Sequence, residues 1–326
     1  MCNDLSCIIT KNYKIIENFR ETNSHEDLIE TFGLDDSEEA RYLQKWVRVE
    51  FRPPSENIED LSKWELDLDE DSVPDWWDED KARSLLESRI NQIIIREDRK
   101  LVLGGCWIIA GGNIGKIKNS KVLAICGSAQ VGRIYGSAQV ERICGSAQVK
   151  EIHGSAQVEM IYDSAQVTSI YDSAQVEYIC GSAQVTSICG LAQVGRICGS
   201  TQVGRIYGSA QVKEIYGSAQ VTRIYGSAQV KDIYGSAQVK WIYDSAQVTR
   251  IYGSAQVKEI YGSAQVKEIF GSAQVKEIYD SAQVERIYDS AQVERIYDSA
   301  QVKEKEKGVK IGKVYPGVKI NGRIKK

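Results

Sequence analysis

Histidine is almost missing from this sequence of 326 residues, which has only His25 and His153, and the eight cysteines form no Cys-x-x-Cys pair. A Cys/His or Ser/His/Asp catalytic centre needs a histidine beside a nucleophile, and nothing in the sequence places either histidine there. His25 falls in an expected helix and His153 replaces a tyrosine in a repeat, so we expect surface or filling roles. We therefore predict a non-enzymatic protein with no catalytic, cofactor-binding or metal-binding residues.

Long apolar segments are also missing, since no run approaches the roughly 18 residues of a membrane span. The first residues, MCNDLSCIIT, lack the basic region and apolar core of a signal peptide. Five of the cysteines replace tyrosine inside a repeat, a usage typical of small filling side chains in a reducing compartment. We expect a cytoplasmic protein that has no membrane partner.

Strong charge of one sign is missing from the long middle of the chain. Residues 125–304 carry 16 Lys and Arg against 18 Asp and Glu, a net charge of −2. Residues 1–124 carry 17 against 26, a net of −9, and residues 305–326 carry 8 against 1, a net of +7. The middle segment offers no strong field for nucleic acid, which makes nucleic acid an unexpected partner.

What is present is a nine-residue phrase repeated twenty times without insertion or deletion. Ile recurs at every ninth position from Ile125 to Ile296, and a Gln-Val pair recurs from Gln130 to Val302. The two residues after Val vary freely and are mostly polar, whereas the residue two places after Ile is always Gly or Asp. Gly and Asp both tolerate left-handed backbone angles, so this position predicts a corner, as Asn119 does in a degenerate first unit.

Strand geometry explains the rest of the phrase. Ala and Val stand two apart and face one side of a strand, while the intervening Gln faces the other side. Val and Ile stand three apart, so both face inward only if the chain bends at the variable pair. A helix is excluded because nine residues make 2.5 helical turns, which would point successive units in opposite directions. The pattern predicts a parallel β-solenoid.

The length of one coil follows from its contour. Nine residues give only about 30 Å of extended chain, which is tight around Val, Ile and Ala, so two units per 18-residue coil are favoured over one. Twenty units then make about ten coils and a rod of about 48 Å. In such a rod the Gln amides could bond from rung to rung. Cys126, Cys144, Cys180 and Cys198 would share one face, with Cys189 on the other.

The flanking segments predict four regions. Residues 1–100 form a small α+β head, with helices over 24–32 (capped by Ser24), 35–46 (an Asp36/Glu39 capping box) and from 75 onward (capped by Asp75), and strands over 47–51 and 63–68. Residues 101–124 are strands that lead into the solenoid and cap its N-terminal end. The solenoid proper covers 125–304. The basic tail, 305–326, alternates like a strand and covers the last rung.

The head and the phrase together resemble a known family. The segments YLQKWVRVEFRPPSENIED and KWELDLDEDSVPDWW, followed by tandem GSAQV units, are similar to uncharacterised bacterial and phage or prophage proteins with a Trp-rich N-terminal domain before many S-x-Q-V phrases. The resemblance covers most of the chain and implies a head-plus-solenoid architecture of microbial or viral origin, with no activity attached. Calcium-binding β-rolls share the nine-residue period but have a double Gly and an Asp in every unit, which are lacking here.

Three motifs were weighed for metal or phosphate chemistry. Asp67, Asp69 and Asp71 have part of an EF-hand spacing, but Ser72 and Pro74 stand where that loop does not accept them, which favours a solvated acidic loop. The cysteine ladder brings thiols about 5 Å apart, yet one column makes no tetrahedral site, so packing is favoured. The segment GGCWIIAGGNIG does not spell a phosphate-binding glycine loop and suits tight turns.

The weak candidates for an interaction surface are aromatic: Trp76 and Trp77 in the head, and Tyr178 and Trp241 in the variable pair of the repeat. For Trp76 and Trp77, packing of the head core is favoured for at least one of the two. We predict a structural or protein-interaction repeat protein with an unknown protein partner. The alternatives are a mobile-element or phage-encoded inhibitor that binds a host macromolecule and, less favoured, an enzyme in the head.

Overall fold

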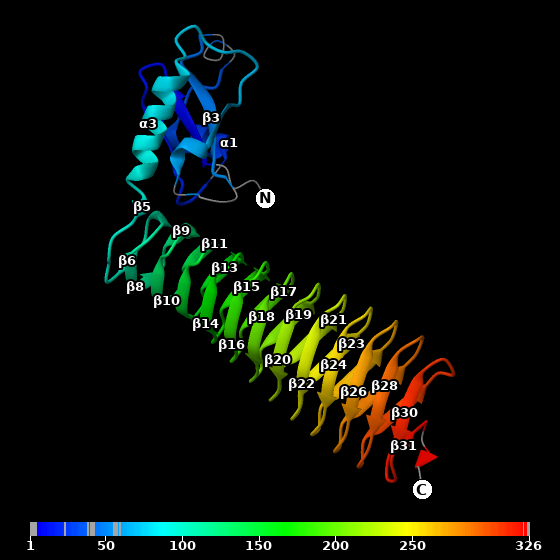
Figure 1. The fold of residues 1–326 in the computed structure, drawn as a ribbon. Coiled ribbons are helices and arrows are strands. Elements are labelled where there is room, and N and C mark those ends of the chain that lie inside the picture. Colours follow the sequence, from blue (N-terminus) through cyan, green and yellow to red (C-terminus); the bar gives the residue numbers. More distant parts are fainter. Residues whose placement is uncertain are drawn as a thin grey trace.

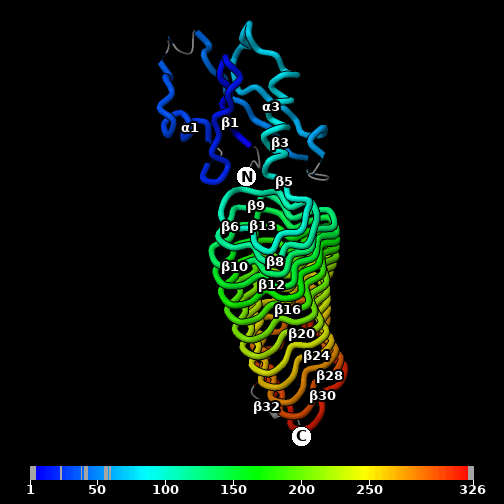
Figure 2. Tube along the Cα trace, turned by 90° about the vertical axis from the view of Figure 1, so that its left-hand side faces the viewer, coloured from blue at the N-terminus to red at the C-terminus, as the bar shows by residue number. Residues whose placement is uncertain are grey.

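The computed structural model describes residues 5–22, 24–37, 39, 43–54, 58, 60–321 and 323–324. A small head with two helices stands on one end of a long rod of short strands (Figure 1). A second view shows the rod as a stack of similar coils, with the C-terminus at the end farthest from the head (Figure 2). No helix in the described ranges has the length and apolar character needed to span a bilayer.

The rod consists of two sheets of parallel strands that alternate along the chain. The 13-stranded sheet holds the even-numbered strands, which are β6 (Val102–Leu103), β8 (Asn113–Lys118), β10 (Gln130–Tyr135), β12 (Gln148–Ile152), β14 (Gln166–Ile170), β16 (Gln184–Ile188), β18 (Gln202–Ile206), β20 (Gln220–Ile224), β22 (Gln238–Ile242), β24 (Gln256–Ile260), β26 (Gln274–Ile278), β28 (Gln292–Ile296) and β30 (Lys310–Val314).

The 15-stranded sheet holds β5 (Ile94–Ile95), β7 (Cys106–Ile109), β9 (Lys121–Ile125), β11 (Gln139–Ile143), β13 (Gln157–Ile161), β15 (Gln175–Ile179), β17 (Gln193–Ile197), β19 (Gln211–Ile215), β21 (Gln229–Ile233), β23 (Gln247–Ile251), β25 (Gln265–Ile269), β27 (Gln283–Ile287), β29 (Gln301–Lys305), β31 (Lys319–Ile320) and β32 (Arg323–Ile324). Of these, β32 alone pairs antiparallel, with β31, at the C-terminal end.

The register confirms a parallel β-solenoid in which each coil contains two units of the phrase. Gln211 pairs with Gln229 and Ile215 with Ile233, each two units further on, while the intervening unit pairs in the other sheet. The rod has more rungs than the ten expected from the phrase, because segments without the phrase also stack: β8 lies on β10 and β30 on β28. With 13 strands in the shorter sheet, the rod is about 60 Å long at about 4.8 Å per rung.

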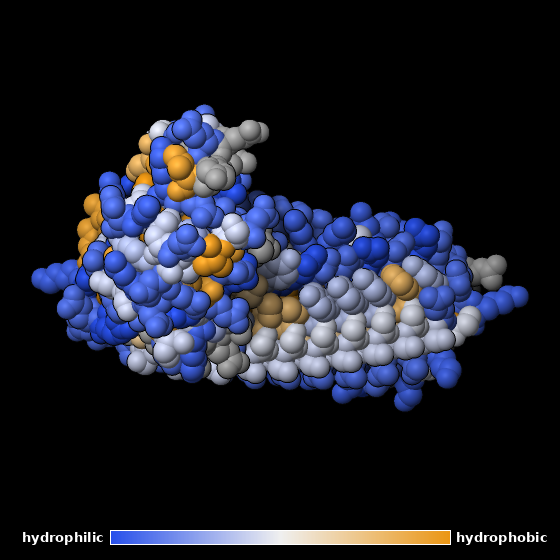
Figure 3. Space-filling model, turned by 90° about the horizontal axis from the view of Figure 1, so that it is seen from above, coloured by the Kyte–Doolittle hydropathy of each residue, from blue (hydrophilic) through white to orange (hydrophobic). Residues whose placement is uncertain are grey.

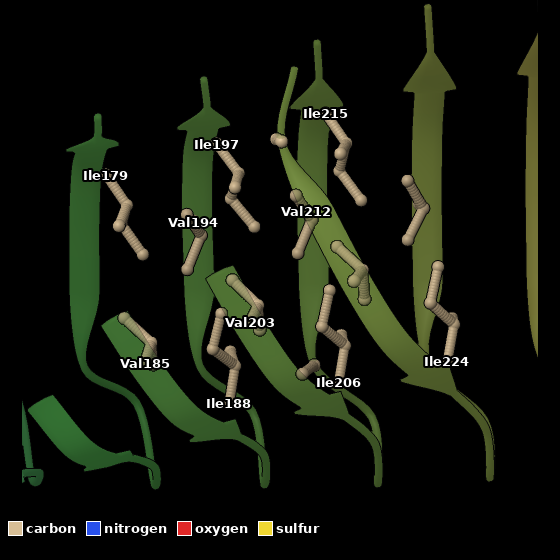
Figure 4. Packing of buried hydrophobic residues seen from close by; sticks show 14 of the residues in the cluster. Ile179, Val185, Ile188, Val194, Ile197, Val203, Ile206, Val212, Ile215 and Ile224 are labelled. Atoms are coloured by element: carbon tan, nitrogen blue, oxygen red, sulfur yellow. The ribbon is translucent and has the colours of Figure 1, made fainter. Parts of the chain in front are cut away.

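The core lies between the two sheets and repeats with the phrase. Val and Ile of each unit are both buried although they stand three apart, so the strand bends at the variable pair as predicted. Val185 and Ile188 of one sheet face Ile179, Val194 and their neighbours from the other (Figure 4). Ala closes the rung at the corner, as at Ala219, except where the buried Thr201 replaces it, so the units contribute nearly the same apolar set to one continuous core.

The corners have the left-handed backbone predicted from Gly and Asp. Gly235 has φ +67°, Asp280 has φ +55°, and Asn119 of the degenerate unit has φ +50°. Asp adds a contact that the pattern does not reveal, because the carboxylate of Asp163 accepts a hydrogen bond from the backbone N–H of Gly145, one rung back, at 3.1 Å. The corner of one coil is thereby tied to the next.

The head is an antiparallel four-stranded sheet with a helix on each face. Its strands are β1 (Leu5–Thr10), β2 (Ile15–Ile16), β3 (Trp46–Arg52) and β4 (Glu65–Leu68), in the order β2-β1-β3-β4, with a short 3-10 turn, η1 (Leu61–Lys63), before β4. Helix α1 (His25–Phe32) packs Leu28 against Ile8 on one face. Helix α3 (Glu79–Asn91) packs Leu86 in the cluster of Val49 and Phe51 on the other.

The predicted helix starts in the head have different outcomes. Ser24 caps α1 as expected, accepting from the backbone N–H of Asp27. The start at Asp75 is wrong: α3 begins after Asp78, whose carboxylate accepts from Lys81 N, because the chain first makes a turn in which Trp77 N donates to the Pro74 carbonyl. Of the helix expected over 35–46, residues 38 and 40–42 lie outside the described residues. Glu39 is helical and its carbonyl accepts from Leu43 N, but the expected C-terminal end is wrong, because Gln44 has a left-handed φ of +44° and Trp46 already begins β3.

The head is joined to the rod by a shared apolar cluster. Leu86 and Ile90 of the head cluster with Ile108, Ala124 and Cys144 on the outer side of the first coils. This contact covers the outer face of the N-terminal part of the 15-stranded sheet with apolar side chains of the head.

Candidate interaction surfaces

The rod presents each outward position of the phrase as a straight column, because equivalent residues stack at one-rung intervals. Gln pairs in register with Gln along both sheets, for example Gln238 with Gln256. The surface accordingly shows rows of one hydropathy running along the rod (Figure 3). Within the described residues no side-chain hydrogen bond joins two of these glutamines, so the expected amide ladder is not formed and the amides face water.

The bend beside Val hollows each sheet into a shallow groove along the rod axis. In the 13-stranded sheet a groove of about 460 Å³ crosses β20 to β28, and its rim carries the residue after Val. Those residues include Lys240, Lys258 and Lys276 on three successive rungs, with Thr222 before them and Glu294 after them. We call Lys240, Lys258 and Lys276 the lysine column.

The 15-stranded sheet has a corresponding groove of about 490 Å³ nearer the head, across β9 to β19. Here the residue after Val is Glu141, Glu159 and Glu177 on successive rungs, followed by Gly195 and then Lys213. The two sheets therefore share backbone and Gln columns but differ in the charge at the groove rim.

Most charges at the second variable position are neutralised between rungs. Arg250 contacts Asp232 at 2.6 Å, Arg295 contacts Glu277 at 2.6 Å, and Arg133 contacts Glu151 at 3.0 Å, each pair joining equivalent positions on neighbouring rungs. In contrast, neither Lys240 nor Lys276 pairs with any carboxylate in the described part of the chain. Lys258 is only 3.3 Å from Glu259, its neighbour in sequence. The lysine column is thus the less compensated charge on this face.

The tyrosines form two half-buried stacks, one along the corner of each sheet. Tyr243 and Tyr261 have ring centroids 4.9 Å apart and planes 3° from parallel, and the same holds along most of both columns. Several hydroxyls donate to a glutamate of the previous rung, as Tyr234 does to Glu214 at 3.1 Å. Burial first, and then this bond to the carboxylate, raises the pKa of Tyr234 to about 12. The stacked tyrosine rings stabilise the rod, and only the edges of the rings are accessible to a partner.

The cysteines lie where the 18-residue coil predicts. Cys126, Cys144, Cys180 and Cys198 follow strands of the 15-stranded sheet, and Cys189 follows β16 of the other. Burial first, and then a hydrogen bond that the Cys180 thiol donates to Cys198, raises the pKa of Cys180 to about 12. A thiol that holds its proton is a poor nucleophile and metal ligand, which favours the packing role.

The four aromatic candidates lie in three separate places. Trp76 and Trp77 are half-buried, pack against the head core, and meet edge to face with centroids 6.2 Å apart. The Trp76 indole N–H donates to the Gln44 carbonyl at 2.7 Å, so its polar atom is used within the head. The contacts of both residues support the core packing that was favoured for at least one of them.

Tyr178 and Trp241 lie on different sheets of the rod, on β15 and β22, and both are half-buried. The reason is stacking with cationic neighbours: the Arg196 guanidinium lies 5.2 Å from the Tyr178 ring, and Lys240 Nζ lies 4.0 Å from the Trp241 ring. Trp241 thereby joins the lysine column, whereas Tyr178 belongs to the opposite face.

One cluster in the head has no counterpart in the sequence patterns. His25 Nδ1 lies 3.3 Å from Asp69 Oδ2, although one residue begins α1 and the other follows β4. Glu50 of β3 lies in the same cluster. The three residues are far apart in the sequence, so no sequence pattern indicates the cluster. The pairing of β3 with β4 and the packing of α1 on this sheet bring His25, Glu50 and Asp69 together.

These surfaces define a β-solenoid repeat protein with a small α+β head. No protein-family model, curated protein or solved structure matches this chain.

Proposed function

We propose that this chain is a non-enzymatic interaction protein, in which the solenoid is a rigid rod that binds an acidic protein partner along the groove of the 13-stranded sheet. The observation that carries the proposal is the lysine column, with three like charges at one-rung spacing beside the half-buried Trp241. Like charges placed side by side cost free energy in the unbound rod, and an acidic partner removes that cost.

The rod geometry supports this role. A continuous core and in-register strands hold the columns fixed before binding, which reduces the ordering entropy of association. Trp241 offers a large amphipathic surface of the kind that is enriched among binding hot spots. The head packs on the outer face of the first coils, which supports a role for the head as a cap and for the rod as the binding surface.

An inhibitor that mimics a nucleic-acid duplex is the less favoured reading. Mimicry needs an acidic stripe along one face, and the acidic column of the 15-stranded sheet spans only Glu141, Glu159 and Glu177 before Gly195 and Lys213 end it. The opposite groove is basic. The charge pattern therefore supports protein binding more than imitation of DNA.

The proposal is tested with full-length chain used as bait in extracts of the cells that make it, followed by reconstitution with each purified binder. The test variant carries Lys240→Glu, Lys258→Glu and Lys276→Glu. The matched control carries Lys213→Glu, Lys231→Glu and Lys267→Glu, which makes the same change at the same repeat position on the other sheet. Circular dichroism of both variants verifies that the rod is intact.

We expect the reconstituted complex to lose at least tenfold in affinity in the test variant and to be unaffected in the control. If both variants weakened the complex equally, binding would depend on the net charge of the rod, and the proposal that the partner binds in the groove of the 13-stranded sheet would be wrong. A binder that follows the head and ignores both variants would place recognition in the head.

A further inference from the structure

The imidazole of His25 lies between two acceptors. Its Nε2 is 3.1 Å from the carbonyl oxygen of Val49, and its Nδ1 is 3.3 Å from Asp69 Oδ2. A backbone carbonyl only accepts, so Nε2 carries a proton and donates it. In the neutral ring Nδ1 then points a lone pair at a carboxylate, which is unfavourable unless a cation lies between them.

The surroundings fit a metal ion in that place. The ligand atoms of His25, Glu50 and Asp69 all lie within 4.8 Å of one another. In a tetrahedral site with Zn–N and Zn–O bonds of about 2.0–2.2 Å, two ligand atoms are about 3.4 Å apart, close to the 3.3 Å between Nδ1 and Oδ2. One imidazole and two carboxylates are also ligand types that such an ion takes.

The outer contacts have the form that metal ligands commonly take. Donation from His25 Nε2 to a backbone carbonyl fixes the ring and directs Nδ1 inward, and His25 is only 5% exposed. Arg52 holds one carboxylate oxygen of Glu50 and also contacts Asp67 at 3.0 Å, which orients Glu50 and leaves its other oxygen free to ligate.

We propose that the head binds one divalent first-row transition ion of the zinc type through His25 Nδ1, Glu50 and Asp69, with water completing the coordination. The imidazole ligand separates this class from Ca²⁺ and Mg²⁺, which take oxygen ligands. The site shares Asp69 with the EF-hand spacing of the same acidic segment but takes its other two ligands from α1 and β3, and it is separate from the groove on the rod. It gives the head a binding role beyond capping.

The test titrates Co²⁺ and then Zn²⁺ into the reduced full-length protein and its variants Asp69→Asn and Glu50→Gln. The matched control is Asp71→Asn, which removes the same charge two residues away from Asp69, from another exposed side chain. Visible d–d absorption of Co²⁺ reports coordination, and near-ultraviolet thiolate bands report any binding to the cysteines of the rod.

The expected result is one equivalent of Co²⁺ without thiolate bands, displaced by Zn²⁺, with affinity at least tenfold lower in both ligand variants and unchanged in the control. The ¹⁵N shift of His25 Nδ1 should move on Zn²⁺ addition, which a merely structural histidine would not show. Thiolate bands alone, equal binding by all variants, or no binding with His25 doubly protonated would each overturn the proposal.

Discussion

The rod and the head solve the packing problem in opposite ways. In the rod, nearly every unit of the phrase buries the same Ala, Val and Ile, and its strand pairs with the equivalent strand two units further along the chain. In the head, each contact is made once and joins distant segments: the Tyr13 hydroxyl donates to the carbonyl of Trp76, 63 residues on. Because the same contacts repeat, equivalent side chains of the rod line up in columns. Because the contacts of the head are each made once, they bring unlike residues together, as in the cluster of His25, Glu50 and Asp69.

The difference locates specificity in each region. Under the proposed function, recognition on the rod depends on the variable pair, as in the lysine column and Trp241, because the other outward positions are the same on nearly every rung. In the head, specificity is built by juxtaposition of residues that no period relates, as with His25 and Asp69. The following changes test how far the two regions really differ.

The largest effect is expected from breaking the period of the rod. Deletion of Val212 alone puts Lys213 in the inward position of β19, and burying an unpaired ammonium costs several kcal/mol. Deletion of the whole unit 212–220 keeps every inward position apolar and only exchanges the sheets of later units, so the thermal midpoint should change little. Circular dichroism melts of both proteins check this, and equal losses would contradict a rod built from interchangeable units.

The next largest effect is expected from a cavity made in the core of either region, and it should show whether the rod and the head unfold separately. Ile215→Ala in the rod and Leu86→Ala in the head each remove a fully buried side chain, at a cost of about 2–5 kcal/mol. Because Trp46, Trp64, Trp76 and Trp77 all lie in the head, tryptophan fluorescence reports mainly on the head. We expect Leu86→Ala to shift the fluorescence transition and Ile215→Ala to shift only the circular dichroism of the rod. A fluorescence shift of equal size in both variants would mean that the two regions unfold as one.

A corner substitution has a smaller effect. At Gly235, with φ +67°, an added Cβ lies 3.0 Å from the backbone nitrogen of Gly217, and an L-residue in this conformation costs about 1–2 kcal/mol. Gly235→Asp should lose less than Gly235→Ala, because its carboxylate can accept from Gly217 N–H as Asp163 accepts from Gly145. Chemical denaturation of the two variants measures the difference, and equal losses would show that the Asp corners merely tolerate strain.

Alkaline pH should weaken the rod gradually. Burial and the Glu214 carboxylate raise the pKa of Tyr234 to about 12 in the folded chain, whereas the unfolded value is about 10. The folded rod retains the proton longer, so this stabilisation is complete below about pH 10 and is lost as pH rises through about 12. Denaturation midpoints at about pH 9 and about pH 11.5 should differ less in Tyr234→Phe than in the parent. An unchanged difference would exclude Tyr234 as a contributor.

The rod could be predicted closely because each nine-residue unit repeats the same spacing of apolar and turn-forming residues. The spacing of Ala, Val and Ile, together with the Gly/Asp position, predicted the sheets, the bend, the left-handed corner and the two cysteine faces. The extra rungs were underestimated because β8 and β30 keep the inward spacing of apolar residues without the phrase. Backbone pairing requires only that inward positions stay apolar, which a search for repeats does not detect.

The head could be predicted only in pieces. Local signals gave α1 with its Ser24 cap and the alternating strands β3 and β4, but strand order and the packing of α1 over β3 depend on contacts distant in sequence. Asp78 displaced Asp75 as the cap of α3 because a turn at Pro74 intervenes. The cluster of His25, Glu50 and Asp69 joins three elements, and no spacing rule indicates it.

In a two-sheet rod with two units per coil, equivalent residues two units apart are neighbours on successive rungs. Spin labels placed at Thr222 and Glu294 through non-cysteine chemistry test this directly, since both residues lie along the groove of the 13-stranded sheet, where β20 and β28 are four rungs apart. Pulsed electron paramagnetic resonance should give a narrow distribution near about 19 Å. A distance near about 38 Å would indicate one unit per coil and contradict both the rod and the columns on its surface.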